Sequence, residues 1–363
     1  MRSQASSKAR WHALVLLPLV LLGLAVSAQS APAAPVSKVA SAISLPKDES
    51  PHPSTPQEWW YFNGHVSGID PSGKLHQYGV LLSFIRRNPD NTAPASVLYD
   101  SIFAITDLTK GTFSSDMNEF ATEPDNVLPQ GGYNVTVNQD NARGINGQNT
   151  LTATIPDGSY GISLQANQYQ PFALHGNGGV IPYGPFGSSY YYSQTNLQTF
   201  GTLTDHGVPI RVTGVSWMDH QWGAFIPGSQ GGWTWFSVQL ANGTQYMFYF
   251  IVDANGNLAQ TVATRINPGG STVNLDPSQV SLTPLGKWTS PTTGYTYTQN
   301  WKVSLPGGAF TINALQQNQE PTIQTPAGVS GFWEGDSSVT GTVGGVPVFG
   351  TSYVEITPNF TMP

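Results

Sequence analysis

Apolar and polar residues alternate with a period of two along many short stretches of this chain. This period is typical of β-strands, in which successive side chains point to opposite faces of a sheet. Between residues 296 and 306, for example, the pattern places Trp301, Val303 and Leu305 on one face. Runs of this kind are predicted as strands at residues 77–87, 133–139, 150–156, 161–168, 234–240, 245–252, 301–307, 310–317 and 351–358.

Helical periodicity is nearly absent beyond the N-terminal segment, so the chain is predicted to be all-β. Gly (39 residues) and Pro (28 residues) are plentiful, which suits short strands joined by many turns. Charged residues make up only 10% of the chain, but aromatic residues make up 11% and supply apolar surface that offsets the entropy of folding. These features favour a β-sandwich or β-barrel over disorder.

The first 28 residues are predicted to be a signal peptide. A basic start precedes an apolar run from Ala13 to Ala28, and Val26-Ser27-Ala28 is a small-residue cleavage site. The run contains Pro18 and is short for a membrane span of about 20 apolar residues, although an uncleaved anchor is the alternative. Residues 29–45 are rich in Ala, Pro and Ser and are predicted to be a linker. The mature protein is therefore expected to be exported, to the periplasm or the extracellular space.

Charge and cysteine content exclude several classes of protein. The formal net charge is −7, and signal-peptide cleavage would reduce the basic residues from 14 to 11 against 21 acidic ones. That balance lacks the basic footprint of a nucleic-acid-binding protein. Cysteine is absent, which excludes disulfide bonds and thiolate chemistry. No HExxH spacing, phosphate-binding glycine loop or G-x-S-x-G motif occurs, so we expect no metal and no cofactor.

A weak internal repeat suggests two similar β-domains in tandem. The stretch EWWYFNGHVSGIDPSGKLHQYGVLLSFI aligns with GWTWFSVQLANGTQYMFYFIV, each with an aromatic cluster, a glycine turn and a tyrosine that opens an apolar strand. The matched residues are Trp59 and Trp60 with Trp233 and Trp235, Phe62 with Phe236, and Tyr78 with Tyr246. Chance similarity between two aromatic hairpins is the alternative. With the join near HQWGAFIPGSQGG, the predicted domains are residues 46–224 and 225–363.

The stretch QEWWYFNGHV places a carboxylate and an imidazole beside four aromatic side chains. In a strand, Glu58, Trp60 and Phe62 would share one face, and Trp59 and Tyr61 the other. A plain core strand has no need of charged groups. The stretch is therefore predicted to form one wall of a ligand cavity, whose polar groups could perform acid–base chemistry.

The stretch VSWMDHQWG places Asp219 and His220 next to each other, so that in a strand they face opposite sides. His220 and Trp222 share a face and form a candidate cavity pair. Glu334 is another carboxylate embedded in aromatic residues, in the stretch FWEG. Tyrosines 190–192 alternate between faces, and a hydroxyl from this run could form a hydrogen bond with Asp219 or His220.

Each of these ionisable residues also has a structural interpretation. Glu58 could be a buried carboxylate paired with an arginine such as Arg86 or Arg211, instead of an acid with a raised pKa. Asp219 could accept backbone hydrogen bonds where the two domains join. His220 could be a hydrogen-bonded core histidine.

Five motifs occur in order along the chain: QEWWYFNGHV, YYYSQTNLQTFGTL, VSWMDHQWG, GWTWFSVQLANG, and FWEG followed by GTSYVEIT. Together they closely resemble the carotenoid 1,2-hydratase family, also described as hydroxyneurosporene synthase-like or AttH-like. The resemblance runs from about Pro46 to Thr361. It implies an all-β fold with two tandem lipocalin-like barrel or sandwich domains.

The resemblance also implies an activity, because the better-known members add water to isoprenoid double bonds. Such hydration needs an acid that protonates the alkene, and aromatic faces stabilise the resulting cation by about 0.5 to 2 kcal/mol per ring. A carboxylic acid in apolar surroundings can be the donor. We therefore predict an exported hydro-lyase-type enzyme that acts on an isoprenoid or prenyl C=C bond without a cofactor. The alternative is a non-catalytic lipocalin-like carrier of a hydrophobic ligand.

One departure from the family pattern affects the choice of acid. In the family's hydratases the His-x-Trp motif acts with a Tyr and an Asp on a strand of the following domain. Here that strand reads TQYMFYFIVD, in which Tyr246 matches the Tyr but Phe248 stands where the Asp is expected. The nearest acid is Asp253 at the strand's end, which leaves Glu58 and Asp219 as substitute acids.

The sequence thus predicts two sets of site residues and one kind of partner. The predicted catalytic residues are His220, Asp219, Glu58 and Tyr246. The predicted ligand-binding residues are Trp60, Trp222, Phe62, Trp233, Tyr191 and Glu334. The expected partner is a hydrophobic small molecule, an isoprenoid or a lipid; association with a membrane surface is left open, and no protein partner is indicated.

Overall fold

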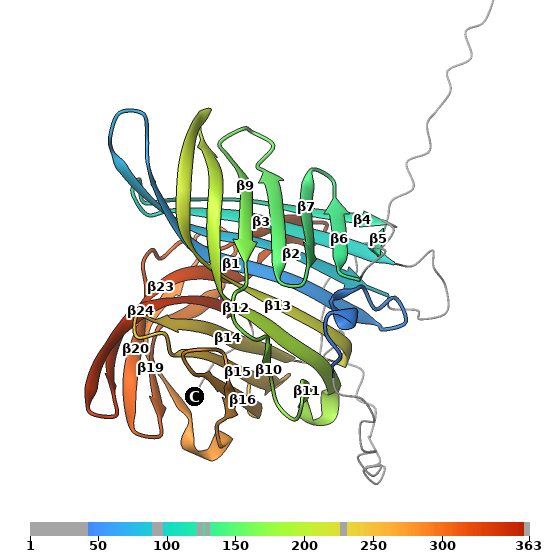
Figure 1. Ribbon diagram of the computed structural model, residues 1–363, viewed down its shortest axis with the longest axis vertical. Coiled ribbons are helices and arrows are strands. Elements are labelled where there is room, and N and C mark those ends of the chain that lie inside the picture. Colours follow the sequence, from blue (N-terminus) through green and yellow to red (C-terminus); the bar gives the residue numbers. More distant parts are fainter. Residues whose placement is uncertain (1–42, 89–96, 122–125, 128–130, 226–230, 359–363) are drawn as a thin grey trace, which may run out of the picture.

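The computed structural model describes residues 43–88, 97–121, 126–127, 131–225 and 231–358, which are coloured in Figure 1. The predicted signal peptide (residues 1–28) and the predicted linker up to residue 42 lie outside the described residues. Within the part of the chain that is described, no helix has the length and apolar character needed to cross a membrane.

Most of the described chain forms antiparallel β-strands, which confirms the predicted all-β class. The helical elements in the described ranges are three single 3-10 turns: η1 (Lys47–Glu49), η3 (Gly184–Phe186) and η4 (Pro277–Gln279). The strands of the first sheet are β1 (Gln57–Ile69), β2 (Leu75–Arg87), β3 (Leu98–Asp107), β4 (Thr112–Ala121), β5 (Asn126–Val127), β6 (Tyr133–Val137), β7 (Asp140–Ile145), β8 (Gln148–Thr154), β9 (Tyr160–Asn167), β10 (Ala173–Leu174), β11 (Val180–Pro182), β12 (Gly187–Asp205) and β13 (Val208–Phe225).

The second sheet is built from the C-terminal part of the chain. Its strands are β14 (Gly231–Leu240), β15 (Gln245–Asp253), β16 (Leu258–Ile266), β17 (Thr272–Asn274), β18 (Ser281–Thr289), β19 (Thr296–Leu305), β20 (Gly308–Ala314), β23 (Trp333–Val343) and β24 (Val346–Ile356). A separate hairpin pairs β21 (Thr322–Thr325) with β22 (Gly328–Gly331).

The two sheets curve differently (Figure 1). The first runs in the order β4-β3-β2-β1-β13-β12-β9-β8-β7-β6-β5, and contacts of β6 with β3 and β4 bring its ends together into a nearly closed barrel. The second runs in the order β17-β16-β15-β14-β24-β23-β20-β19-β18 and forms a half-barrel. This arrangement is that of two lipocalin-like units, as the family resemblance implied.

Three apolar clusters follow from the alternation along the strands. One fills the first barrel and includes Trp60 and Phe62. A second cluster lies inside the half-barrel and includes Trp301, Val303 and Leu305. The predicted common face of these three residues is therefore confirmed. The third cluster joins the two sheets. Its buried members include Tyr61, Tyr191, Trp217, Trp235, Met247, Tyr249 and Tyr353.

The predicted repeat corresponds to the opening hairpin of each sheet, β1–β2 and β14–β15. Phe62 and Phe236 both point into the interior of their own sheet. The match of Trp60 with Trp235 is wrong, because Trp60 lies in the first interior whereas Trp235 lies between the sheets. Strand alternation makes Tyr61 the positional counterpart of Trp235.

Candidate active site between the two sheets

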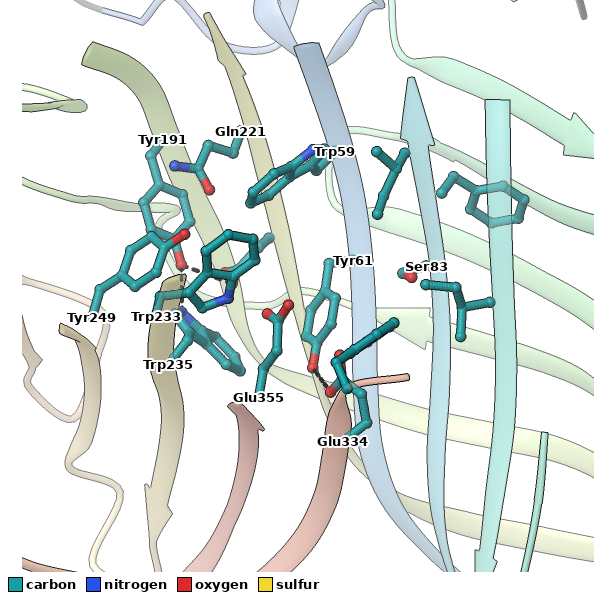
Figure 2. Close-up of a pocket in the computed structure, with 15 residues that line it drawn as sticks. Trp59, Tyr61, Ser83, Tyr191, Gln221, Trp233, Trp235, Tyr249, Glu334 and Glu355 are labelled. Atoms are coloured by element: carbon teal, nitrogen blue, oxygen red, sulfur yellow. Dashed lines mark hydrogen bonds between the residues drawn. The ribbon is translucent and has the colours of Figure 1, made fainter. Parts of the chain in front are cut away.

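A pocket of about 570 Å³, part of which is its open mouth, lies between the barrel and the half-barrel. Strands β1, β2, β3, β12 and β13 of the first sheet form one wall, and β14, β15, β23 and β24 of the second form the other (Figure 2). The lining residues are Trp59, Tyr61, Ser83, Phe84, Ile85, Ile102, Tyr191, Asp219, Gln221, Trp233, Trp235, Tyr249, Phe332, Glu334 and Glu355.

The register between β1 and β13 assembles the first wall. Trp59 lies opposite Gln221 and Tyr61 lies opposite Asp219. Because side chains alternate along each strand, all four point to the same face of the sheet, toward the second unit. The aromatic run and the WMDHQWG motif thus contribute to one site although they are about 160 residues apart in the sequence.

Asp219 is a buried carboxyl that accepts three side-chain hydrogen bonds. The Tyr191 hydroxyl donates to Oδ2 at 2.7 Å, the Trp217 indole donates to Oδ1 at 2.6 Å, and the Ser193 hydroxyl also donates to Oδ1. Burial raises the pKa of Asp219 to about 7, although these donors act in the opposite direction. Asp219 is therefore poised to gain or lose a proton near neutral pH.

A hydrogen-bonded chain extends from Asp219 away from the pocket. Ser193 lies opposite Asp219 on β12 and is 2.7 Å from Nε2 of His175. The other ring nitrogen of His175 lies 3.0 Å from the hydroxyl of Thr264 on β16. Burial lowers the pKa of His175 to about 3, so its imidazole is neutral. Because the Ser193 proton is donated to Asp219, Nε2–H of His175 is the donor toward Ser193.

Two more carboxyls enter the pocket from the second sheet, where Glu334 on β23 lies opposite Glu355 on β24. The Tyr61 hydroxyl donates a 2.6 Å hydrogen bond to Glu334, which Figure 2 shows as a dashed line. Burial, and then the nearby Glu355 charge, raise the pKa of Glu334 well above its usual value. Burial raises the pKa of Glu355 to about 8, with the Trp233 indole lowering it and Asp219 raising it further.

Aromatic rings surround these carboxyls. The rings of Trp59 and Trp233 lie 5.5 Å apart, and those of Tyr61 and Trp235 meet edge to face at 5.3 Å. The Trp235 indole donates to the Tyr191 hydroxyl at 2.9 Å, which fixes the tyrosine against Asp219. The indole nitrogen of Trp59 is buried without a hydrogen-bond partner in the described residues, so it is available to an acceptor on a ligand.

The pocket therefore combines carboxylic acids with π-faces and lacks a balancing cation. No lysine, arginine or histidine is among its lining residues in the described part of the chain. Carboxyls that burial keeps protonated near neutral pH can donate protons, and the rings can stabilise a carbocation.

Four predicted site residues lie in this pocket: Asp219, Tyr191, Trp233 and Glu334. The expected hydrogen bonds from the tyrosine run are also present. Tyr191 donates to Asp219, and the hydroxyl of Tyr192 lies 3.1 Å from Nδ1 of His220.

Five other predicted residues, Glu58, Trp60, Phe62, His220 and Trp222, lie on the opposite face of β1 and β13, inside the first barrel. His220 and Trp222 were expected to form a cavity pair, but neither lines this pocket. Side chains alternate along β13, so when Asp219 points into the pocket, His220 and Trp222 point into the barrel.

Glu58 is buried and paired, as its structural interpretation expected, but its hydrogen bonds are with two histidines where the sequence suggested an arginine such as Arg86 or Arg211. Its Oε1 lies 2.8 Å from Nε2 of His220 and 2.8 Å from Nδ1 of His52, and its Oε2 accepts the backbone N–H of His52 at 2.7 Å. Burial alone would raise the pKa of Glu58, but the hydrogen bonds from the two histidines leave it below its usual value. Glu58 is thus an ionised carboxylate and does not have the raised pKa that was expected of an acid.

Tyr246 lies in the interior of the half-barrel, away from the pocket. Its ring stacks on that of Phe248 at 5.5 Å, and both residues are buried in the second apolar cluster. The position where the family pattern led us to expect an Asp therefore also faces this interior. The neighbouring position, Tyr249, faces the pocket instead.

Sequence reasoning missed several residues of the site. Glu355 lies in a predicted strand, but a single glutamate there cannot be distinguished from a solvent-facing one. Tyr61 was placed on the face opposite Glu58, correctly, but the cavity was expected on the Glu58 side. His52 and His175 lie outside the predicted strands and outside the five motifs, and nothing in the sequence indicated that they would contact Glu58 and Ser193.

Comparisons with known proteins agree on the fold. The model of the AttH-like family matches residues 36–358. No curated protein matches the chain.

Among solved structures, an AttH protein from Nitrosomonas europaea is similar over 90% of this chain and 100% of its own, at 27% identity and a TM-score of 0.76. Kievitone hydratase from Nectria haematococca is similar over 87% of this chain and 93% of its own, at 20% identity and a TM-score of 0.69. CghA in complex with Sch210972 matches at 15% identity and a TM-score of 0.51, covering 84% of this chain and 88% of its own. The last two show a shared fold.

Proposed function

The chain belongs to the AttH-like family, and we propose that it is an acid-catalysed hydratase that adds water to an isoprenoid or prenyl C=C bond. The site of the reaction is the pocket between the two sheets. The observation that carries the proposal is a group of three carboxyls in aromatic surroundings, the buried Asp219 and Glu334 and the half-buried Glu355, whose pKa values are all raised. The fold shared with kievitone hydratase is consistent with this reaction class.

Glu355 is assigned as the proton donor. Its pKa of about 8 keeps it protonated at neutral pH, and its O–H bond breaks as the alkene π electrons form a new C–H bond. The positive charge then resides on the tertiary carbon of the prenyl group. Glu334, whose pKa is also raised and whose carboxyl accepts a hydrogen bond from Tyr61, assists as a second acid.

The rings around the pocket stabilise the cation. Trp59, Trp233 and Trp235 offer π-faces that each contribute about 0.5 to 2 kcal/mol toward a desolvated cation. Surroundings of this kind also exclude bulk water, so that only a water molecule admitted beside the substrate reaches the cation.

Asp219 is assigned as the base. Its three donors hold the carboxylate form, and its pKa of about 7 is lower than that of Glu355. When water attacks the cation through its oxygen, Asp219 takes the surplus proton and a tertiary alcohol remains. Return of that proton from Asp219 to Glu355 restores the starting state, so the net change is the addition of one water.

A panel of acyclic isoprenoids and prenylated aromatic compounds, incubated with the protein in ¹⁸O-labelled water, tests the proposal. Mass spectrometry should reveal products that have gained one labelled water. Asp253→Asn, at an exposed turn outside the pocket, is the matched control for Asp219→Asn and should retain the product. Recovery of unmodified lipid bound to the protein, with no hydrated product from any compound, would instead support a carrier function.

A further inference from the structure

A second cluster of ionisable residues lies on the other face of β1 and β13, inside the barrel. It joins three parts of the chain: His52 in the segment before β1, Glu58 on β1 and His220 on β13. Glu58 and His220 are fully buried, and the side chain of His52 is 20% exposed. None of the three lines the pocket described above, so the cluster is separate from the proposed hydratase site.

The donor atoms of this cluster match those of a transition-metal site. One carboxylate oxygen and two imidazole nitrogens lie within 4.8 Å of one another, with Glu58 Oε1 2.8 Å from each nitrogen. Two histidines and one glutamate are a ligand set that Zn²⁺ uses when a fourth position is left for water. The partial exposure of His52 provides a route by which an ion can enter.

Each imidazole has an oxygen beside the ring nitrogen that faces away from Glu58. The Tyr192 hydroxyl lies 3.1 Å from Nδ1 of His220, and Asp48 Oδ1 lies 3.8 Å from Nε2 of His52. Metal-bound histidines usually have such a partner, which fixes the tautomer and the direction of the ring. The rings are also held from the side, because His52 stacks on Trp222 at 3.9 Å.

We propose that His52, Glu58 and His220 form a binding site for a divalent transition-metal ion, of which Zn²⁺ fits the donor set best. The ion would bind the nitrogen lone pairs that face Glu58, and each neutral ring would carry its proton on the outer nitrogen, toward the Tyr192 hydroxyl or Asp48. It would also fasten the segment before β1 to two strands of the barrel. The site is independent of the hydratase proposal.

A similar group elsewhere does not compete. His76, Asp107 and Asp205 are buried near one another, but the Lys110 ammonium already contacts Asp205 and lies 3.5 Å from Asp107. A cation supplied by the protein therefore occupies the place that a metal ion would take.

Titration of untagged, chelator-treated protein with ZnCl₂ in a calorimeter tests the proposal without any substrate. Wild-type protein should bind one ion per chain and unfold at a higher temperature when loaded. His52→Ala should weaken binding at least tenfold and lose most of the thermal shift. His65→Ala, which removes a histidine paired with Asp336 elsewhere, is the matched control and should bind as wild type.

Two results would overturn the proposal: no binding by the wild type, or binding that is unchanged in His52→Ala. His52 lies outside the strands, so its replacement leaves the sheet hydrogen bonds intact and the protein folded. Glu58→Gln, which keeps the shape of the side chain but removes its charge, should also lose affinity. Co²⁺ absorption adds a second readout, since a tetrahedral site with two nitrogen ligands should give visible bands that His52→Ala abolishes.

Discussion

The two faces of β1 and β13 carry buried carboxyls that behave in opposite ways. On the face between the sheets, Asp219 has neutral donors for partners, and burial raises its pKa to about 7. On the interior face, Glu58 is equally buried, but two histidines reverse the effect of burial and lower its pKa. At these two positions, the imidazole partners that Glu58 has and Asp219 lacks decide the direction of the shift.

This difference assigns separate tasks to neighbouring residues. Asp219 and His220 are adjacent in the sequence. Asp219 lines the pocket with other carboxyls of raised pKa, whereas His220 pairs with the Glu58 carboxylate inside the barrel. The alternation of a single strand is enough to separate them. Chemistry is therefore expected on the face between the sheets, and stability on the interior face.

The largest effect should come from neutralising the acid and the base of the pocket. Glu355→Gln and Asp219→Asn should each lower hydration activity by a factor of about 10² to 10⁴, the usual contribution of general acid–base catalysis. Turnover of the labelled substrate is the measurement, with Asp253→Asn as the control. Wild-type rates in both pocket variants would contradict the assignment of chemistry to this face.

On the interior face, His220→Ala should mainly destabilise the fold. It leaves the buried Glu58 carboxylate with one imidazole partner fewer, which costs about 3 to 5 kcal/mol of unfolding free energy. Denaturant unfolding in the presence of a chelator measures this loss. Lys302→Ala, at an exposed position of β19, should stay within about 0.5 kcal/mol of the wild type. A stable His220→Ala protein that lacks activity would place catalysis on the interior face instead.

The two faces should also differ in how their stability depends on pH. The folded-state pKa values of Asp219 and Glu355, about 7 and about 8, lie above those of the unfolded chain. The native state therefore holds protons that the unfolded state releases, and stability falls as pH rises from about 4 toward 8. Glu58, with its lowered pKa, contributes stability that is lost only as pH falls below its usual range.

The Asp219→Asn variant isolates this effect. Between about pH 5 and 7, its unfolding free energy should fall less steeply with pH than that of the wild type. The two slopes should differ by up to about 1.4 kcal/mol per pH unit, because one proton no longer dissociates on unfolding. Chemical denaturation at several pH values gives the slope. An identical slope in the wild type would mean that Asp219 is already ionised in the folded protein.

The smallest expected effect concerns the unpaired indole nitrogen of Trp59. Trp59→Phe keeps an aromatic face but removes the buried donor. If the ligand carries an acceptor there, KM should rise up to about tenfold, since a hydrogen bond contributes about 0.5 to 1.5 kcal/mol, and kcat should change little. An unchanged KM would mean that the ligand does not reach this nitrogen.

The fold could be predicted well from the sequence because period-two alternation and turn residues are local signals. The strand containing Trp301, Val303 and Leu305 and the faces of the QEWWYF and WMDHQW motifs were predicted correctly. The face of β1 and β13 that meets the second sheet is decided by packing between the sheets, which strand alternation does not reveal. The sequence therefore pointed to Trp60 and His220 as pocket residues, whereas Trp59 and Tyr61 line the pocket. Glu355 reaches the pocket through the pairing of β24 with β14 and β23, and His52 reaches Glu58 from a segment outside any strand, so neither position follows from local alternation.

Infrared titration of the protein's carboxyl groups tests the central claim most directly, because protonated carboxyls absorb separately from ionised ones. At pH 6, where exposed carboxyls are ionised, the wild type should retain a protonated-carboxyl band that fades between about pH 7 and 8. Asp219→Asn and Glu355→Gln should each remove part of that band, and Asp253→Asn should remove none. A band that disappears together with the surface carboxyls near pH 4, or one that neither pocket variant reduces, would contradict the account.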